Sequence, residues 1–326
     1  MDRVVKKPVV VTLLAVLCTF LWGSAFPAVK SGYELFEITN GTTADKLVFA
    51  GMRFLAAGVV ILLLILIIPG KSLRLKRKDY KGIVVLGLLQ TFIQYFFFYI
   101  ALSNMSGSKG SILNATGTFF VVLLSHFLFT NERLTKNKIV GCLVGFGGII
   151  LINFTGDTDL TFHITAEGFM LVAALSFALG SVYSKMILKN MDPLILTGYQ
   201  LFLGGSLLLV TGCLQGGSLG QISGKGVLLF AYLVFISAAG FGIWTLLIKY
   251  NEVTKISIFN CLTPVFGTLL SGIFLSEDIL KMKNLLALLL VVAGIYLVNS
   301  YGRRRVAYYE TKESDGKNNE EKTTTK

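Results

Sequence analysis

The sequence predicts an all-α membrane protein with ten transmembrane helices, arranged as two inverted five-helix repeats. Two observations support this prediction: apolar residues gather in segments of about 20, and the second half of the chain repeats the pattern of the first. Of the 326 residues, 54% are hydrophobic and 15% are charged, and the mean hydropathy is +0.71. A helix of about 20 apolar residues is long enough to cross the hydrocarbon core of a bilayer.

The apolar segments are separated by short polar joints. Each is long and lacks the alternation of a barrel strand, so we expect helices. The first follows Arg3, Lys6 and Lys7, which also suits a secretory signal. No convincing cleavage site follows it and nine more segments do, so it is assigned as helix one. The expected spans are residues 9–29, 44–68, 82–102, 107–130, 138–154, 167–188, 194–214, 227–248, 255–276 and 285–301.

Lysine and arginine residues beside the spans predict the orientation. With the N-terminus in the cytoplasm, the inner segments hold 19 of them and the outer segments hold 6. This bias satisfies the positive-inside rule and predicts that both termini lie on the inner side of the cytoplasmic (plasma) membrane. The net charge of +12 therefore reflects topology and does not indicate nucleic-acid binding. The charges of the basic loop 71–81 either serve only to keep this loop on the cytoplasmic side or also contact anionic lipid head groups.

An internal repeat relates the two halves of the chain. Pairing each residue with the one 146 positions later matches Lys109 with Lys255 and Asn114 with Asn260, without a gap. Because each unit has five helices, the second copy must enter the membrane upside down. Inverted repeats of this kind place a transporter's substrate near the midplane between them. The expected organisation is a cytoplasmic N-terminus (1–8), a first repeat (9–154), an external loop (155–166), a second repeat (167–301) and a disordered cytoplasmic tail (302–326).

The sequence resembles a known family at the ends of both repeats. The phrase CLTPVFGTLLSGIFLSEDI (261–279), followed by VVAGIYLVN (291–299), is similar to the signature of the EamA-type transporters of the drug/metabolite transporter superfamily. ATGTFFVVLLSHFLFTNERLT (115–135) with VGFGGIILIN (144–153) resembles the first-half copy. Thr118 stands where helix nine has Pro264, so helix four is expected to be less kinked. The resemblance implies a ten-helix carrier, often an exporter, of small metabolites, amino acids or drugs.

Other classes fit less well. The chain has no GxxxxGK[ST] or HExxH motif, and its two histidines lie near opposite membrane faces, so we expect neither an enzyme nor a cofactor. A lipid flippase and a non-transporting accessory subunit remain alternatives. All 18 acidic residues fall in loops, helix ends or the tail. A proton-loading carboxylate at membrane depth is therefore not expected, and His126 is interpreted as an interfacial residue rather than a proton relay.

Polar and aromatic residues inside the spans mark the expected cavity. Gln90 and Gln94 share one face of helix three, and aromatic neighbours such as Phe98 and Phe241 are expected to form a wall for an amphipathic solute. The alternative for the polar residues is hydrogen bonding between helices. The candidate substrate-binding residues are Trp22, Gln90, Gln94, Tyr95, Asn114, Tyr199, Trp244, Asn260 and Arg53.

Arg53 is the one clear charge within a span. A buried charge at that depth marks a pathway or a defined partner. Arg53 either binds a substrate carboxylate through two parallel hydrogen bonds, or is held structurally by carbonyl groups or by an acid such as Asp45. Gly141 and Gly145 form a GxxxG pattern, which indicates close helix contact within the chain or in a homodimer.

Overall fold

The computed structural model is all-helical over the residues that it describes, which are 5–70, 72–130, 135–153, 162–277, 282, 285–290, 292–294 and 296–297. Within that part of the chain, eight helices are long and apolar enough to cross a membrane. They confirm the prediction of an all-α, multi-pass membrane protein. The polar tail and most of the loop 155–166 lie outside the described residues.

The eight membrane-length helices contain several shorter elements. Those in the first half are α2 (Pro8–Leu35), α3 (Thr43–Ile67), α4, η1 and α5 (Asp79–Gly87, Leu88–Ile93 and Gln94–Ser103), and α6 and α7 (Gly107–Asn114 and Thr116–Leu128). Those in the second half are η2 and α9 (Ile164–Gly168 and Phe169–Ile187), α10 (Pro193–Leu214), α11 (Gly224–Tyr250), and α12, η3 and α13 (Val253–Ser257, Ile258–Cys261 and Leu262–Leu275). Two further helical segments are α8 (Lys136–Asn153) and Leu285–Gly294.

Several helices begin at polar residues that satisfy the free N–H groups of the first turn. Thr42 and Asp45 form a reciprocal capping box on α3, and the side chain of Asp192 accepts two backbone N–H bonds at the start of α10. The first helix runs to Leu35, beyond the end expected at residue 29. It continues because Tyr33 is buried and donates to the carbonyl of Tyr99, which makes the last turn part of the core.

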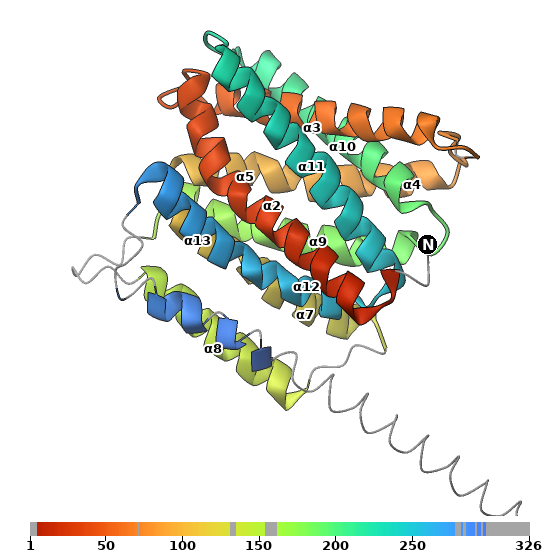
Figure 1. Cartoon of the computed structure of the whole chain (residues 1–326), viewed down its shortest axis with the longest axis vertical. Coiled ribbons are helices and arrows are strands. Elements are labelled where there is room, and N and C mark those ends of the chain that lie inside the picture. The colour runs from red at the N-terminus through yellow and green to blue at the C-terminus, as the bar shows by residue number, and fades with distance from the viewer. Residues whose placement is uncertain are drawn as a thin grey trace, which may run out of the picture.

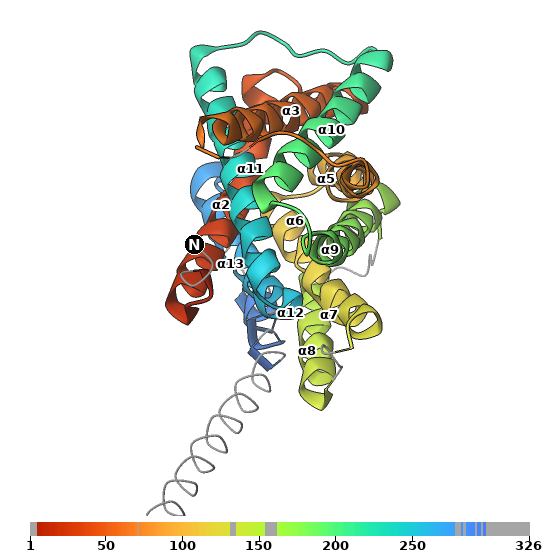
Figure 2. The ribbon, with the colours of Figure 1, turned by 90° about the vertical axis from the view of Figure 1, so that its right-hand side faces the viewer.

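The helices run between two faces of the molecule, at the left and right of Figure 1. We call them the Asn104 face, which carries the joint between α5 and α6, and the Asn190 face, which carries the joint between α9 and α10. Figure 2 shows α2, α11 and α13 on one side and α5, α7 and α9 on the other. Each of these two groups contains helices from both halves of the chain. Helices α3 and α10 lie together at one end of the bundle, and α8 lies at the other (Figure 2).

Helices α3 and α10 pack so closely that a side chain could not fit between them at the glycines. A Cβ atom on Gly51 would lie 2.3 Å from the backbone nitrogen of Leu209, and one on Gly58 would lie 2.4 Å from that of Phe202. Residue numbers rise along α3 as they fall along α10 in these contacts, so the two helices are antiparallel. We call this contact the glycine seam.

The glycine seam is built in the same way from the α10 side. A Cβ on Gly205 would lie 2.3 Å from the backbone nitrogen of Leu55, and one on Gly198 would lie 2.8 Å from Cδ2 of Leu62. The residue 147 positions after Gly51 is Gly198, and the residue 147 positions before Leu209 is Leu62. The contact of Gly51 with Leu209 therefore corresponds, through the repeat, to the contact of Gly198 with Leu62. Every contact in this set therefore has a repeat-related counterpart.

The GxxxG residues of α8 are used within the chain. A Cβ on Gly294 would lie 2.4 Å from the carbonyl oxygen of Gly141 and 2.6 Å from the backbone nitrogen of Gly145. Gly145 also faces the ring of Phe119. Of the two interpretations of this pattern, the structure provides the contact within one chain.

Candidate functional site

The two repeat-related asparagines lie where their helices change geometry. Helix α6 ends at Asn114 and α7 begins at Thr116, while Asn260 lies in the 3-10 turn η3 between α12 and α13. Around the first break, Ala115 N–H bonds the carbonyl of Ile112 at 3.2 Å, which is the shorter i→i−3 pattern of a 3-10 turn. Broken helices of this kind are tolerated at membrane depth where they line a cavity.

A cavity of about 40 Å³ lies between these two breaks. That volume has room for about three water molecules. Each group of helices in Figure 2 contributes to the wall. The lining residues are Trp22, Ala25, Phe26, Arg53, Gln94, Tyr95, Phe98, Asn114, Phe177, Phe241, Asn260 and Thr263.

Three polar atoms on the lining residues are buried without a hydrogen-bond partner among the described residues. They are the indole nitrogen of Trp22, Oε1 of Gln94 and Oδ1 of Asn114. Asn260 differs because its Oδ1 accepts a bond from Thr263 Oγ1 at 3.0 Å. A buried polar group without a partner costs about 1–3 kcal/mol. The lining residues therefore carry one donor and two acceptors that are left without a described partner.

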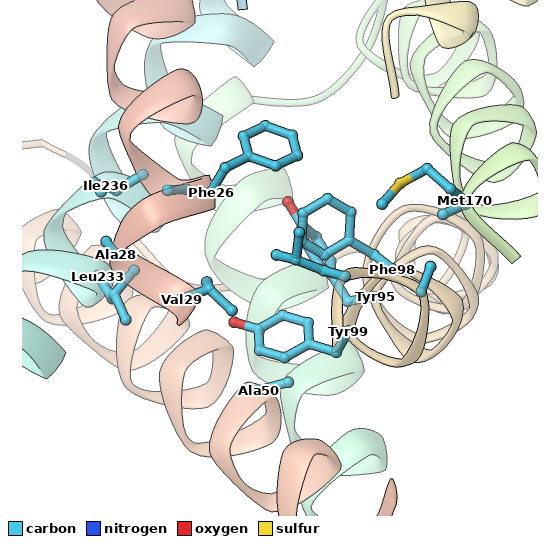
Figure 3. Close-up of a cluster of buried hydrophobic side chains, with 14 of the residues drawn as sticks. Phe26, Ala28, Val29, Ala50, Tyr95, Phe98, Tyr99, Met170, Leu233 and Ile236 are labelled. Atoms are coloured by element: carbon cyan, nitrogen blue, oxygen red, sulfur yellow. The ribbon is translucent and has the colours of Figure 1, made fainter. Parts of the chain in front are cut away.

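Aromatic rings form most of the remaining wall. Phe26 on α2 and Tyr95 and Phe98 on α5 point toward one another (Figure 3), and the ring centroids of Phe26 and Phe98 are 5.5 Å apart. The rings of Phe177 and Phe241 pack against the indole of Trp22, with centroid distances of 6.1 and 5.5 Å, respectively. An aromatic wall with a few convergent polar groups is typical of a small-molecule site.

Arg53 is buried at the edge of this cavity, and its bonds tie three helices together. Its Nε donates to Ser237 Oγ at 2.8 Å and to the Leu233 carbonyl at 3.1 Å, and its Nη1 donates to Tyr99 Oη at 3.0 Å. Among the described acidic residues, none lies within ion-pairing distance of it. Asp45, the acid considered from the sequence, instead caps α3. The bonds support the structural interpretation, while Nη2, without a described hydrogen-bond partner, leaves a charge beside the cavity.

Six of the nine residues predicted from the sequence line the cavity: Trp22, Arg53, Gln94, Tyr95, Asn114 and Asn260. The structure places the other three elsewhere. Gln90 lies in the π-helical turn η1 and donates to Ser181 Oγ at 3.4 Å. Tyr199 donates to the carbonyl of Leu73 at 2.9 Å. Trp244 lies behind Trp22, with ring centroids 4.9 Å apart. That any of the nine binds a substrate stays a prediction.

Ala25, Phe26 and Phe177 also line the cavity but were not singled out from the sequence. Ala25 and Phe26 follow Trp22 and Ser24 by one to four positions on α2, and Phe177 lies on α9 one turn before Ser181. Proximity to a polar residue on the same helix was the available signal. In a chain with 25 phenylalanines that signal selects few positions. No group of three or more metal-ligating side chains occurs in the described part of the chain.

Broken helices that meet at a central cavity, inside a bundle of membrane-length helices, define a multi-pass membrane transporter. Comparison with known proteins gives the family. The EamA-like transporter family matches residues 10–154 and again residues 164–300. The chain therefore belongs to the EamA-like transporter family, as the sequence motifs predicted.

Relatives and a solved structure agree with this assignment. The chain is 29% identical to an uncharacterized transporter of Bacillus subtilis, over 90% of this chain and 93% of that protein. It is 27% identical to a probable amino-acid metabolite efflux pump of Salmonella typhimurium, over 89% and 95% of the two chains. One crystal structure shares the fold, with a TM-score of 0.71 and 18% identity over 91% of this chain and 99% of the other. These relatives are named as transporters, in accord with the expectation that the chain is not an enzyme.

Proposed function

We propose that the protein is a secondary carrier that exports a small metabolite, amino acid or drug-like solute across the cytoplasmic membrane. The observation that carries the proposal is the cavity between the two helix breaks, with its unpartnered Gln94, Asn114 and Trp22 atoms. Those atoms and the aromatic wall suit an amphipathic solute. The direction is inferred from relatives named as probable efflux pumps in Salmonella typhimurium and Escherichia coli.

The carrier is proposed to have ten membrane helices in two inverted repeats. The glycine seam supports this, because an antiparallel contact with repeat-related counterparts is what a two-fold axis in the membrane plane produces. The mixing of both halves in each helix group of Figure 2 supports it further. Helix α8 and the segment Leu285–Gly294 would complete the count.

Alternating access is the proposed mechanism. The cavity of about 40 Å³ is too small for a metabolite, so the two helix groups must separate on one face to admit the solute and on the other to release it. The breaks at Asn114 and Asn260 are the points at which the halves of helices four and nine can bend. A bound solute shifts this equilibrium only by its different affinity for the two states.

The orientation is proposed from the charge bias, with the Asn190 face and both termini inside. Cysteines introduced at Asn137 and at Asn284 should react with an impermeant thiol reagent from the inside and from the outside, respectively. Asn284 lies outside the described residues, so its side is inferred from the sequence alone. Reaction of both positions from the same side would contradict the inverted arrangement.

The test of function compares small molecules in the medium and cytoplasm of cells that express the protein with those of cells that lack it. We expect a set of solutes to accumulate in the medium, and the Asn114→Ala/Asn260→Ala variant to lose this effect. Asn190→Ala, an exposed asparagine in a loop, is the matched control and should behave as the unchanged protein. A redistribution of lipid between leaflets without any solute efflux would instead identify a flippase, and no change of either kind would leave an accessory subunit.

A further inference from the structure

Glu277, just after the end of α13, reaches across to the first half of the chain. Its Oε1 accepts the backbone N–H of Gly107 at 2.7 Å, and its Oε2 accepts the backbone N–H of Ser108 at 3.0 Å and the Ser108 hydroxyl. All three donors belong to the first turn of α6, whose N–H groups have no partner inside the helix. A carboxylate at a helix N-terminus is also favoured by the helix dipole, and charge-assisted bonds are the stronger kind.

The packing next to Glu277 is also close, although the atoms nearest the glycines belong to serine side chains rather than to backbone. A Cβ on Gly107 would lie 2.6 Å from Ser271 Oγ, and a Cβ on Gly267 would lie 2.5 Å from Ser111 Cβ. This contact between α6 and α13 runs from the Asn104 face to Asn114 at the end of α6. It therefore covers the path between that face and the cavity.

Other charges surround the same mouth. Lys109 on α6 forms a salt bridge with Glu167 in η2, just before α9. Lys30 on α2 lies near enough to Glu277 to interact with it electrostatically. Four helices around the path, α2, α6, α9 and α13, are thus connected by polar contacts at this face. Both Glu277 and the Lys109–Glu167 pair join the two repeats.

The repeat does not reproduce the two glycines at the other face. The position related to Glu277 is Asn131, and those related to Gly107 and Gly267 are Val253 and Val121. Close glycine contacts are therefore encoded at one end of the crossing in the described part of the chain, whereas Asn131 and the acidic Glu132 beside it lie outside the described residues. Between α7 and α12, Thr118 Oγ1 donates a long hydrogen bond to the Ser257 carbonyl, at 3.3 Å.

We propose that Glu277 is a latch that keeps the cavity closed toward the Asn104 face, and that release of its bonds to Gly107 and Ser108 is required for the cavity to open there. The proposal deepens the carrier function and rests on it. In the open state the carboxylate and the first-turn N–H groups of α6 would be solvated by water, so the latch can close and open reversibly. The latch makes closure on this face the resting condition of the protein.

The test measures access to the cavity from each side. Ala25, which lines the cavity, is replaced by cysteine in a chain whose native cysteines have been replaced by alanine. Right-side-out and inverted membrane vesicles are treated with an impermeant, charged thiol reagent. We expect Glu277→Gln to raise the rate of reaction from the Asn104 side about tenfold, the change that loss of one strong bond produces. Ser108→Ala removes only the hydroxyl donor and should raise the rate by a smaller factor.

The matched control is Glu252→Gln, which removes the carboxylate paired with Lys255 at the other end of the same helix and should leave the rate unchanged. An unchanged rate in both Glu277→Gln and Ser108→Ala would overturn the latch, as would an equal increase in Glu252→Gln. If Glu277→Gln fails to fold, Ser108→Ala decides alone. The readout does not depend on solute movement. If cells export solute but the labelling rate does not change in the variants, the latch is refuted and the carrier function stands. If the labelling rate changes but no solute efflux is found, the carrier function is refuted and the latch stands.

Discussion

Two contacts in this protein join a helix to its own repeat partner, and they are built differently. In the glycine seam, each glycine of α3 that touches α10 has a glycine counterpart on α10 that touches α3. In the crossing of helices four and nine, the close glycine contacts among the described residues, at Gly107 and Gly267, lie toward the Asn104 face, and the related positions toward the Asn190 face are Val253 and Val121. Apart from Gly212, whose related position on α3 is Ile65, the first contact keeps the symmetry of the repeat, and the second breaks it.

The difference indicates which contact stays fixed and which one moves. Two unbroken helices with their backbones in contact have no room to slide, since interiors at this density transmit strain rather than absorb it. The crossing has a break in each helix and a cavity with unpartnered polar atoms between the breaks. At any moment, a carrier with alternating access is open toward one face and closed toward the other. The crossing of helices four and nine, whose two ends are packed differently, provides such a contact. The following predictions test this comparison, in order of decreasing effect on the folded state.

The largest effect is expected in the glycine seam. In Gly205→Leu, a side chain would have to occupy space 2.3 Å from the Leu55 backbone nitrogen. Overpacking typically costs about 1–3 kcal/mol and more where backbone must move, so we expect little folded protein in detergent by size-exclusion chromatography. Gly242→Ala is the matched control, because the nearest atom to its Cβ would lie 3.5 Å away. A Gly205→Leu protein with the melting temperature of the unchanged chain would refute the fixed seam.

A smaller loss is expected at Arg53, the charged residue that ties α3 to α11 and α5. Arg53→Lys loses the planar fork and Arg53→Gln also loses the charge, so each should lower stability by about 2 kcal/mol, the worth of a bond to a charged group. The measurement is thermal unfolding of the two purified variants. A stable Arg53→Gln protein that has lost only the efflux of anionic solutes would show that Arg53 binds cargo instead.

The smallest effect on folding is expected at Asn114. Its Oδ1 has no partner among the described residues, so Asn114→Ala should change stability by less than about 1 kcal/mol, because no bond is lost. Efflux of the solutes identified in the medium should fall about tenfold, which corresponds to one lost hydrogen bond to the solute. A drop in melting temperature with normal efflux would assign the asparagine to helix packing and remove it from the site.

The sequence predicts the elements that depend on composition. The spans follow from apolar length, and all-α architecture follows from them. The repeat pointed to Asn114 and Asn260 because a buried amide in two equivalent places is costly unless it has a role. Both residues do line the cavity, although their function in binding is still a prediction.

What the sequence could not predict depends on how the helices rotate and bend. Helix four breaks after Asn114 without a proline or glycine at that position, so no local residue signalled the break. Trp244 was expected in the cavity because it is a polar aromatic residue in a span, but Trp22 covers it. The bond from Glu277 to Gly107 joins residues 170 positions apart, and only the packed structure brings them together.

The most direct test of the central claim is a pair of distance measurements by electron spin resonance on the same protein. One pair of spin labels, at Asn104 and Phe274, spans the crossing, and the other, at Thr43 and Leu214, spans the glycine seam. All four positions are exposed toward the Asn104 face. We predict that Glu277→Gln adds a longer distance to the first pair and leaves a single, unchanged distance in the second. A shift in the second pair with no change in the first would contradict the assignment of the moving and fixed contacts.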